Sequence, residues 1–129
     1  MVLDKNGISR LSYLFVSTLR VVGGLKSIGI LDEGGFLERV LLKNRIKVKT
    51  DFMSQADFKY DLKEVSTLLA YNPHEDMLPD VGHMFNDAMV IACFNRQFGY
   101  EEWRKALCDI GKVTTIYRCD SYQMMVVLK

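Results

Sequence analysis

The feature that most constrains the fold of this 129-residue chain is the run Met124–Leu128, which has apolar side chains at five successive positions. Successive side chains of a strand point to opposite faces, so a strand without a polar face needs cover on both sides. We therefore expect residues 122–128 to form a central or covered strand. Residues 113–119 are also rich in β-formers, and the pair Asp120-Ser121 between the two segments predicts a turn.

Several segments carry the apolar spacing of a helix. The clearest is residues 8–22, whose apolar face comprises Leu11, Leu14, Phe15, Thr18, Leu19 and Val22. The pattern also predicts helices over 36–44, over 58–71, from Pro79 to Phe98, and over 101–110. The second of these is expected to end at Tyr71, because Pro73 disfavours a helical conformation at Asn72.

Residues 45–52 alternate instead, which predicts a half-buried strand with Arg45, Lys47 and Lys49 on its outer face. Residues 25–31 are apolar and fit either one helical turn or a short strand. These elements predict an α+β fold, with four or five helices packed on a small, mainly antiparallel sheet of about three strands. The length predicts a single globular domain over residues 1–129.

Charge is distributed unevenly, although the net charge is only +1. Residues 1–50 hold nine Lys or Arg against four Asp or Glu, residues 51–102 hold three against ten, and residues 103–129 hold five against two. Segregated charge creates a directional field that steers the approach of a partner. The distribution therefore indicates a charge-polarised surface that binds something.

Composition argues against a membrane or secreted protein. The longest mostly apolar stretch, residues 11–31, contains Arg20 and Lys26, which are costly inside a bilayer. Asp4 lies near the N-terminus, and no cleavage pattern of small residues follows an apolar run. The three cysteines, Cys93, Cys108 and Cys119, are scattered and odd in number, which favours buried, reduced thiols. We expect a cytoplasmic location and no membrane partner.

The strongest candidate surface for a protein partner is the acidic loop and the helix expected to follow it. Its residues are Glu75, Asp76, Asp80 and Asp87, with Trp103 in a nearby aromatic cluster as a further anchor. Each feature also has a purely structural interpretation. Acidic residues are favoured in the first turn of a helix, and an aromatic cluster can fasten two helices together.

Two alternatives use other residues. The cations Arg45, Lys47 and Lys49 could follow a phosphate backbone, although lysines also protect the edge strand of a sheet from aggregation. A metal-assisted hydrolase could use His74, Asp80, His83 and Asp87, which are common ligand types, although no established metal-binding spacing occurs.

The glycine pairs 23–24 and 34–35 match neither G-x-G-x-x-G nor the nucleoside-triphosphate loop, so no cofactor is expected. No motif specifies a reaction. The sequence thus favours a small, non-enzymatic binding protein of the inhibitor, immunity or regulatory kind, with homo-oligomer formation left open.

Overall fold

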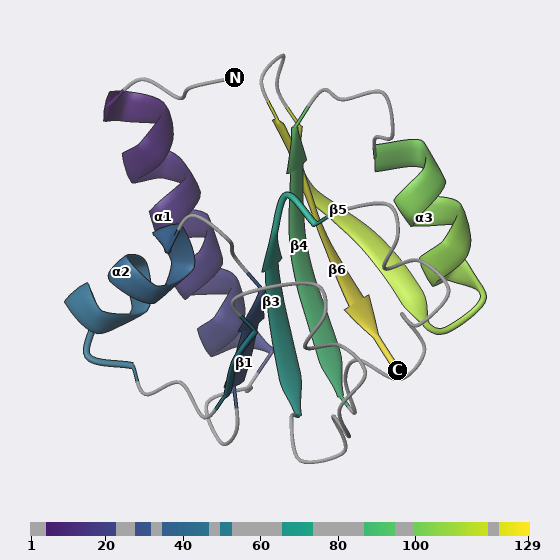
Figure 1. Cartoon of the computed structure of the whole chain (residues 1–129). Coiled ribbons are helices and arrows are strands. Elements are labelled where there is room, and N and C mark those ends of the chain that lie inside the picture. The colour runs from purple at the N-terminus through teal and green to yellow at the C-terminus, as the bar shows by residue number, and fades with distance from the viewer. Residues whose placement is uncertain are drawn as a thin grey trace.

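A computed structural model describes residues 5–22, 28–31, 35–46, 50–52, 66–73, 87–94, 100–118 and 122–129. Within these residues the chain forms three helices and one six-stranded sheet (Figure 1). The helices are α1 (Lys5–Val21), α2 (Phe36–Lys43) and α3 (Tyr100–Cys108). The strands are β1 (Ile28–Leu31), β2 (Thr50–Phe52), β3 (Thr67–Tyr71), β4 (Ala88–Phe94), β5 (Lys112–Arg118) and β6 (Tyr122–Leu128).

The sheet is mixed, with the strand order β2-β1-β3-β4-β6-β5. The first four strands of this order run parallel, whereas β6 is antiparallel to both β4 and β5. The prediction of four or five helices on a three-stranded, mainly antiparallel sheet is therefore wrong. Two parallel strands, β3 and β4, account for this difference, because both lie in segments whose apolar spacing predicted helices.

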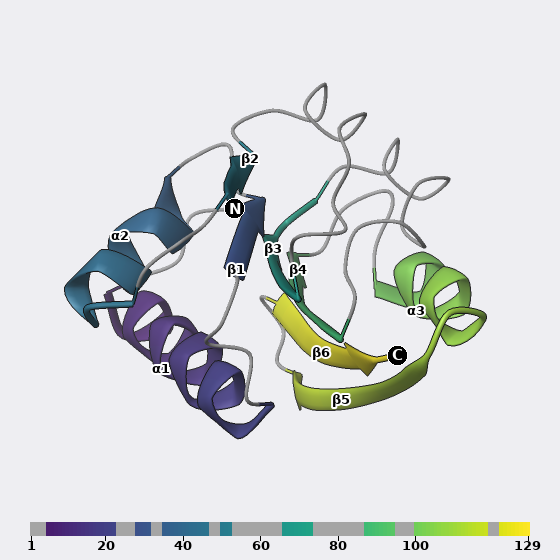
Figure 2. The ribbon, with the colours of Figure 1, turned by 90° about the horizontal axis from the view of Figure 1, so that it is seen from below.

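Helices cover both faces of the sheet, with α1 and α2 on one side and α3 on the other (Figure 2). The larger core lies under α1 and α2. Its buried residues are Leu11, Phe15, Leu19, Ile28, Ile30, Leu37, Leu41, Leu69, Val90, Ala92, Tyr122, Met124 and Val126. The alternate strand residues point to the opposite face, where α3 packs on β5 and β6 with Trp103 and Leu107 fully buried.

Burial on both faces explains the misread segments. All seven described side chains from Thr67 to Ala70 and from Ala88 to Val90 are buried, so neither strand shows the alternation of a half-exposed strand. Short apolar runs of this kind cannot be told from buried helix by periodicity alone. The predicted helices over 58–71 and from Pro79 are thus wrong at residues 67–71 and 88–94.

Other predicted elements are confirmed. The helix α1 buries Leu11, Phe15 and Leu19 as its apolar spacing indicated, and β5 and β6 form the expected antiparallel pair. The strand β6 lies between β4 and β5, which matches its lack of a polar face. No helix among the described residues is both long and apolar enough to span a membrane.

The core under α1 and α2 gives a stability prediction at Ile30, which is 1% exposed. Ile30→Val removes one buried methyl group, so we expect the free energy of unfolding to fall by about 1 kcal/mol. Urea denaturation measures this change. The control Val21→Ala, at a position 85% exposed on α1, should change stability by no more than about 0.5 kcal/mol. Equal losses in the two variants would contradict the assignment of the core.

Candidate functional site

The order of the strands reverses next to β1, and this reversal defines the candidate site. The chain passes from β1 to β2 on one side and then returns to place β3 on the other side of β1. In the parallel register, Leu31 at the end of β1 lies opposite Phe52 of β2 and Ala70 of β3. In open α/β sheets, ligands bind outside the carboxyl ends of the strands at such a reversal.

The first turn of α2 begins directly after the carboxyl end of β1. Gly35 is the N-cap, with φ 72° and ψ 13°, and it gives no side-chain hydrogen bond to the helix. A Cβ on Gly35 would lie 3.2 Å from Nη1 of Arg39, so the guanidinium sits beside the turn. The same turn also contains Glu38, so the positive end of this helix carries both an acidic and a basic side chain.

The end of β3 forms the second side of the site. The ring of Tyr71 packs on Phe36 of α2 with centroids 4.6 Å apart. Asn72 adopts a left-handed φ of 55°, and its N–H donates to the carbonyl of Ala92 at 2.6 Å. Pro73, which follows, is buried. Asparagine adopts this left-handed conformation more readily than most residues, so Asn72 suits the sharp change of direction at the end of β3.

The third side is β2, whose acidic residue is Asp51, opposite Ile30 of β1. Asp51 lies one residue before the end of its strand. The described residues therefore place a glycine turn, a guanidinium and an aromatic pair around one reversal of strand order, with β2 as the neighbouring strand.

The residues expected to bind a protein partner lie elsewhere or outside the described ranges. Asp87 is exposed at the amino end of β4, where its N–H donates to Ser66 O at 2.9 Å and its carbonyl accepts from the N–H of Lys129 at 3.0 Å. It therefore lies at the amino ends of the parallel strands, opposite to the candidate site. Trp103 lies on the inner face of α3 and is 0% exposed. Glu75, Asp76 and Asp80 lie outside the described residues.

The residues of the two alternative sites also lie elsewhere than expected or outside the described residues. Arg45 is exposed in the turn after α2 at φ 58°, so its placement on a basic strand is wrong, while Lys47 and Lys49 lie outside the described residues. His74 and His83 also lie outside them. Among the residues that the structure describes, no three His, Cys, Asp or Glu are grouped to hold a metal ion.

The cysteines need one correction. Cys108 is a free cysteine and is exposed on α3, contrary to the expectation of a buried thiol. It is the last residue of α3, and the residue before it, Leu107, is fully buried.

The sequence analysis missed Gly35, Arg39, Tyr71 and Asn72 as site residues. One signal could have found the turn: a short apolar strand, Ile28–Leu31, runs through two acidic and two glycine residues into an apolar helix. This strand-turn-helix order resembles the phosphate-binding turn of nucleotide-binding folds, although the glycine spacing differs from G-x-G-x-x-G. No local signal identifies Tyr71 and Asn72, because their place depends on the pairing of β3 with β1.

Comparison with known proteins gives a likeness of fold. No protein-family model matches the chain, and no curated protein matches its sequence. Among solved structures, the chain is similar to the methyltransferase domain of a bacterial Hen1 protein, CtHen1-CN. The two are 12% identical in sequence, with a TM-score of 0.59, and the match covers 93% of this chain and 98% of that chain.

This likeness corrects the functional expectation. The described sheet and helices resemble the fold of a methyltransferase domain, and this finding contradicts the prediction of a small non-enzymatic binding protein. Its two alternatives, a nucleic-acid-binding regulator using residues 45–49 and a metal-assisted hydrolase using His83, are set aside with it.

Proposed function

We propose that this chain is a methyltransferase domain that binds S-adenosylmethionine at the carboxyl edge of β1, β2 and β3. The observation that carries the proposal is the reversal of strand order at β1, with a left-handed glycine opening the helix that follows. It occurs in a fold similar to that of a methyltransferase domain along nearly the whole chain. Ligands of α/β folds bind at this position in the sheet.

The residues at this edge fit the chemistry of the donor. S-adenosylmethionine carries a carboxylate, a ribose with two hydroxyl groups and a flat base. The first turn of α2 and the guanidinium of Arg39 suit the carboxylate, because both favour negative charge. The absence of a side chain on Gly35 leaves the backbone open to close approach.

The donor, when bound, supplies a methyl group activated on a sulfonium sulfur. The chain's own residues then bind and orient it. Phe36 and Tyr71 pack their rings together between the first turn of α2 and the end of β3. Asn72, held by its hydrogen bond to Ala92, fixes the backbone at the end of β3.

Isothermal titration with S-adenosylhomocysteine, the demethylated form of the donor, tests the proposal. We expect one site per chain, with a dissociation constant on the order of 1 μM to 1 mM, the usual range for enzyme ligands. Saturation should also raise the melting temperature, because a ligand that binds only the folded state stabilises it. A titration to millimolar ligand with neither heat nor a thermal shift would refute donor binding.

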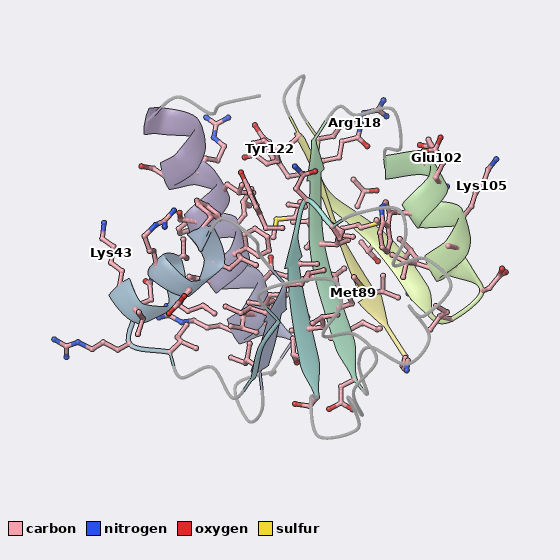
Figure 3. All side chains as sticks on the ribbon, viewed as in Figure 1. Lys43, Met89, Glu102, Lys105, Arg118 and Tyr122 are labelled. Carbon is pink, nitrogen blue, oxygen red and sulfur yellow. The ribbon has the colours of Figure 1, made fainter. Side chains whose placement is uncertain are left out.

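Arg39 provides a specific test of the carboxylate contact. Arg39→Ala should weaken S-adenosylhomocysteine binding about tenfold, the typical effect of losing a charge-assisted hydrogen bond. The matched control is Lys43→Ala, which removes a cation from the last turn of the same helix, where the side chain extends into solvent (Figure 3). The same two variants should bind adenosine, which has no carboxylate, with equal affinity. Equal weakening by both variants toward S-adenosylhomocysteine would show a general effect of net charge instead.

A further inference from the structure

An irregularity in the β5–β6 pair turns one side chain toward α1. The two strands pair regularly from Lys112 to Thr115, and Thr115 lies opposite Met125. The next paired residue is Tyr117, opposite Met124, so Ile116 is an extra residue in β5. Because side chains alternate between faces, this bulge brings Tyr117 to the α1 side of the sheet, where Met124 is buried. Bulges often re-aim a side chain beside a functional site.

The re-aimed tyrosine meets a cation on α1. Nη1 of Arg10 donates to the hydroxyl of Tyr117 at 2.6 Å, and the guanidinium carbon lies 5.7 Å from the centroid of the ring. The same ring packs on Tyr122, with centroids 5.6 Å apart. Tyr122 is 2% exposed and belongs to the core under α1, which anchors the contact.

This contact lies at the end of the sheet that carries the candidate site. Tyr122 pairs with Phe94, the last residue of β4, so it lies at the carboxyl ends of the parallel strands. Figure 1 shows the first turns of α1 at the same end of the molecule as the end of β4, and Figure 3 shows Tyr122 there. Arg10 directly precedes Leu11 in α1, and Leu11 is fully buried. The Arg10–Tyr117 hydrogen bond therefore joins the first half of α1 to β5, the outermost strand on that side of the sheet.

We propose that Arg10 and Tyr117 are a positioning pair, which holds the first half of α1 in place as one wall of the donor site. This inference rests on the proposed function. Without the bulge, Ile116 would face α1 in place of Tyr117, and the hydrogen bond could not form. Neither residue contacts the donor. Both act by holding α1 in position.

A double-mutant cycle with Arg10→Met, Tyr117→Phe and the combined variant tests the pair. Hydrogen exchange of α1 amides in the free protein should accelerate about fivefold in each single variant, because one hydrogen bond is lost, with no further change in the double variant. The dissociation constant of S-adenosylhomocysteine should rise about fivefold with the same non-additivity. Arg20→Met, in the last turn of α1, is the matched control and should change neither quantity.

The outcomes separate the two proposals. Unchanged exchange in the single variants, or changes that add in the double variant, would overturn the pair. Faster exchange with unaltered ligand affinity would overturn the role of α1 as a wall. A wild-type protein that binds no S-adenosylhomocysteine would refute the proposed function and the wall with it, while exchange in the free protein would still decide whether the pair holds α1.

Discussion

Replacing Gly111 by alanine is expected to lower the free energy of unfolding by about 3 kcal/mol. Gly111 joins α3 to β5. A Cβ at this residue would lie 2.2 Å from the carbonyl oxygen of Leu128 and 2.9 Å from its carbonyl carbon. Both atoms belong to the backbone at the end of β6, so no side-chain rotation can relieve the contact. Either the α3–β5 connection or the end of β6 must shift.

Chemical denaturation measures this loss, and a parallel thermal scan should show a melting temperature lower by roughly 10 °C. Thr114→Ala serves as the control, because Thr114 is exposed on the neighbouring strand β5, and it should change stability by about 0.5 kcal/mol at most. If Gly111→Ala were as stable as the control, the close approach of Gly111 to β6 would be absent from the protein in solution.

Replacing Gly35 by valine should produce the largest loss of ligand affinity, about 100-fold for S-adenosylhomocysteine. The φ of 72° at Gly35 is strongly disfavoured for a β-branched residue. The added side chain would also press on the guanidinium of Arg39, which lies 3.2 Å from the position of a Cβ. Relief of this strain displaces the turn between β1 and α2. This turn is the proposed position of the donor's carboxylate.

A second substitution separates backbone strain from crowding of the site. Gly35→Asn keeps a residue type that tolerates a left-handed conformation, so the variant should fold with a stability within about 1 kcal/mol of wild type. It still introduces a side chain beside Arg39, so its affinity should fall as well. Wild-type affinity in both variants would show that the donor does not approach Gly35.

Those elements that depend on local pattern could be predicted from the sequence. The helical spacing of Leu11, Phe15 and Leu19 specified α1, and the turn pair between two β-rich segments specified β5 and β6. The parallel strands could not be predicted in this way. Met89 and Ile91 face one side and Val90 and Ala92 the other, and all four are fully buried, so β4 shows no polar face to set its period.

The candidate site was missed because it is created by strand order. Tyr71 lies more than 30 residues after Gly35 and Arg39, and neither Gly35 nor Tyr71 lies in a strongly charged segment. Charge distribution describes how a surface attracts partners, whereas the position of a ligand in an α/β fold follows from the carboxyl ends of adjacent strands. The neighbouring strand β3 is needed to bring Tyr71 to Phe36, and no local sequence signal shows that pairing.

Donor binding at the carboxyl ends of β1 and β3 is tested most directly by mapping amide chemical shifts during a titration with S-adenosylhomocysteine. We expect saturable shifts at Gly35, Phe36, Tyr71 and Asn72, which lie at this end of the parallel strands. We expect none at Asp87 and Lys129, which lie at the opposite end. Shifts confined to the opposite end, or none at millimolar ligand, would contradict donor binding at this site.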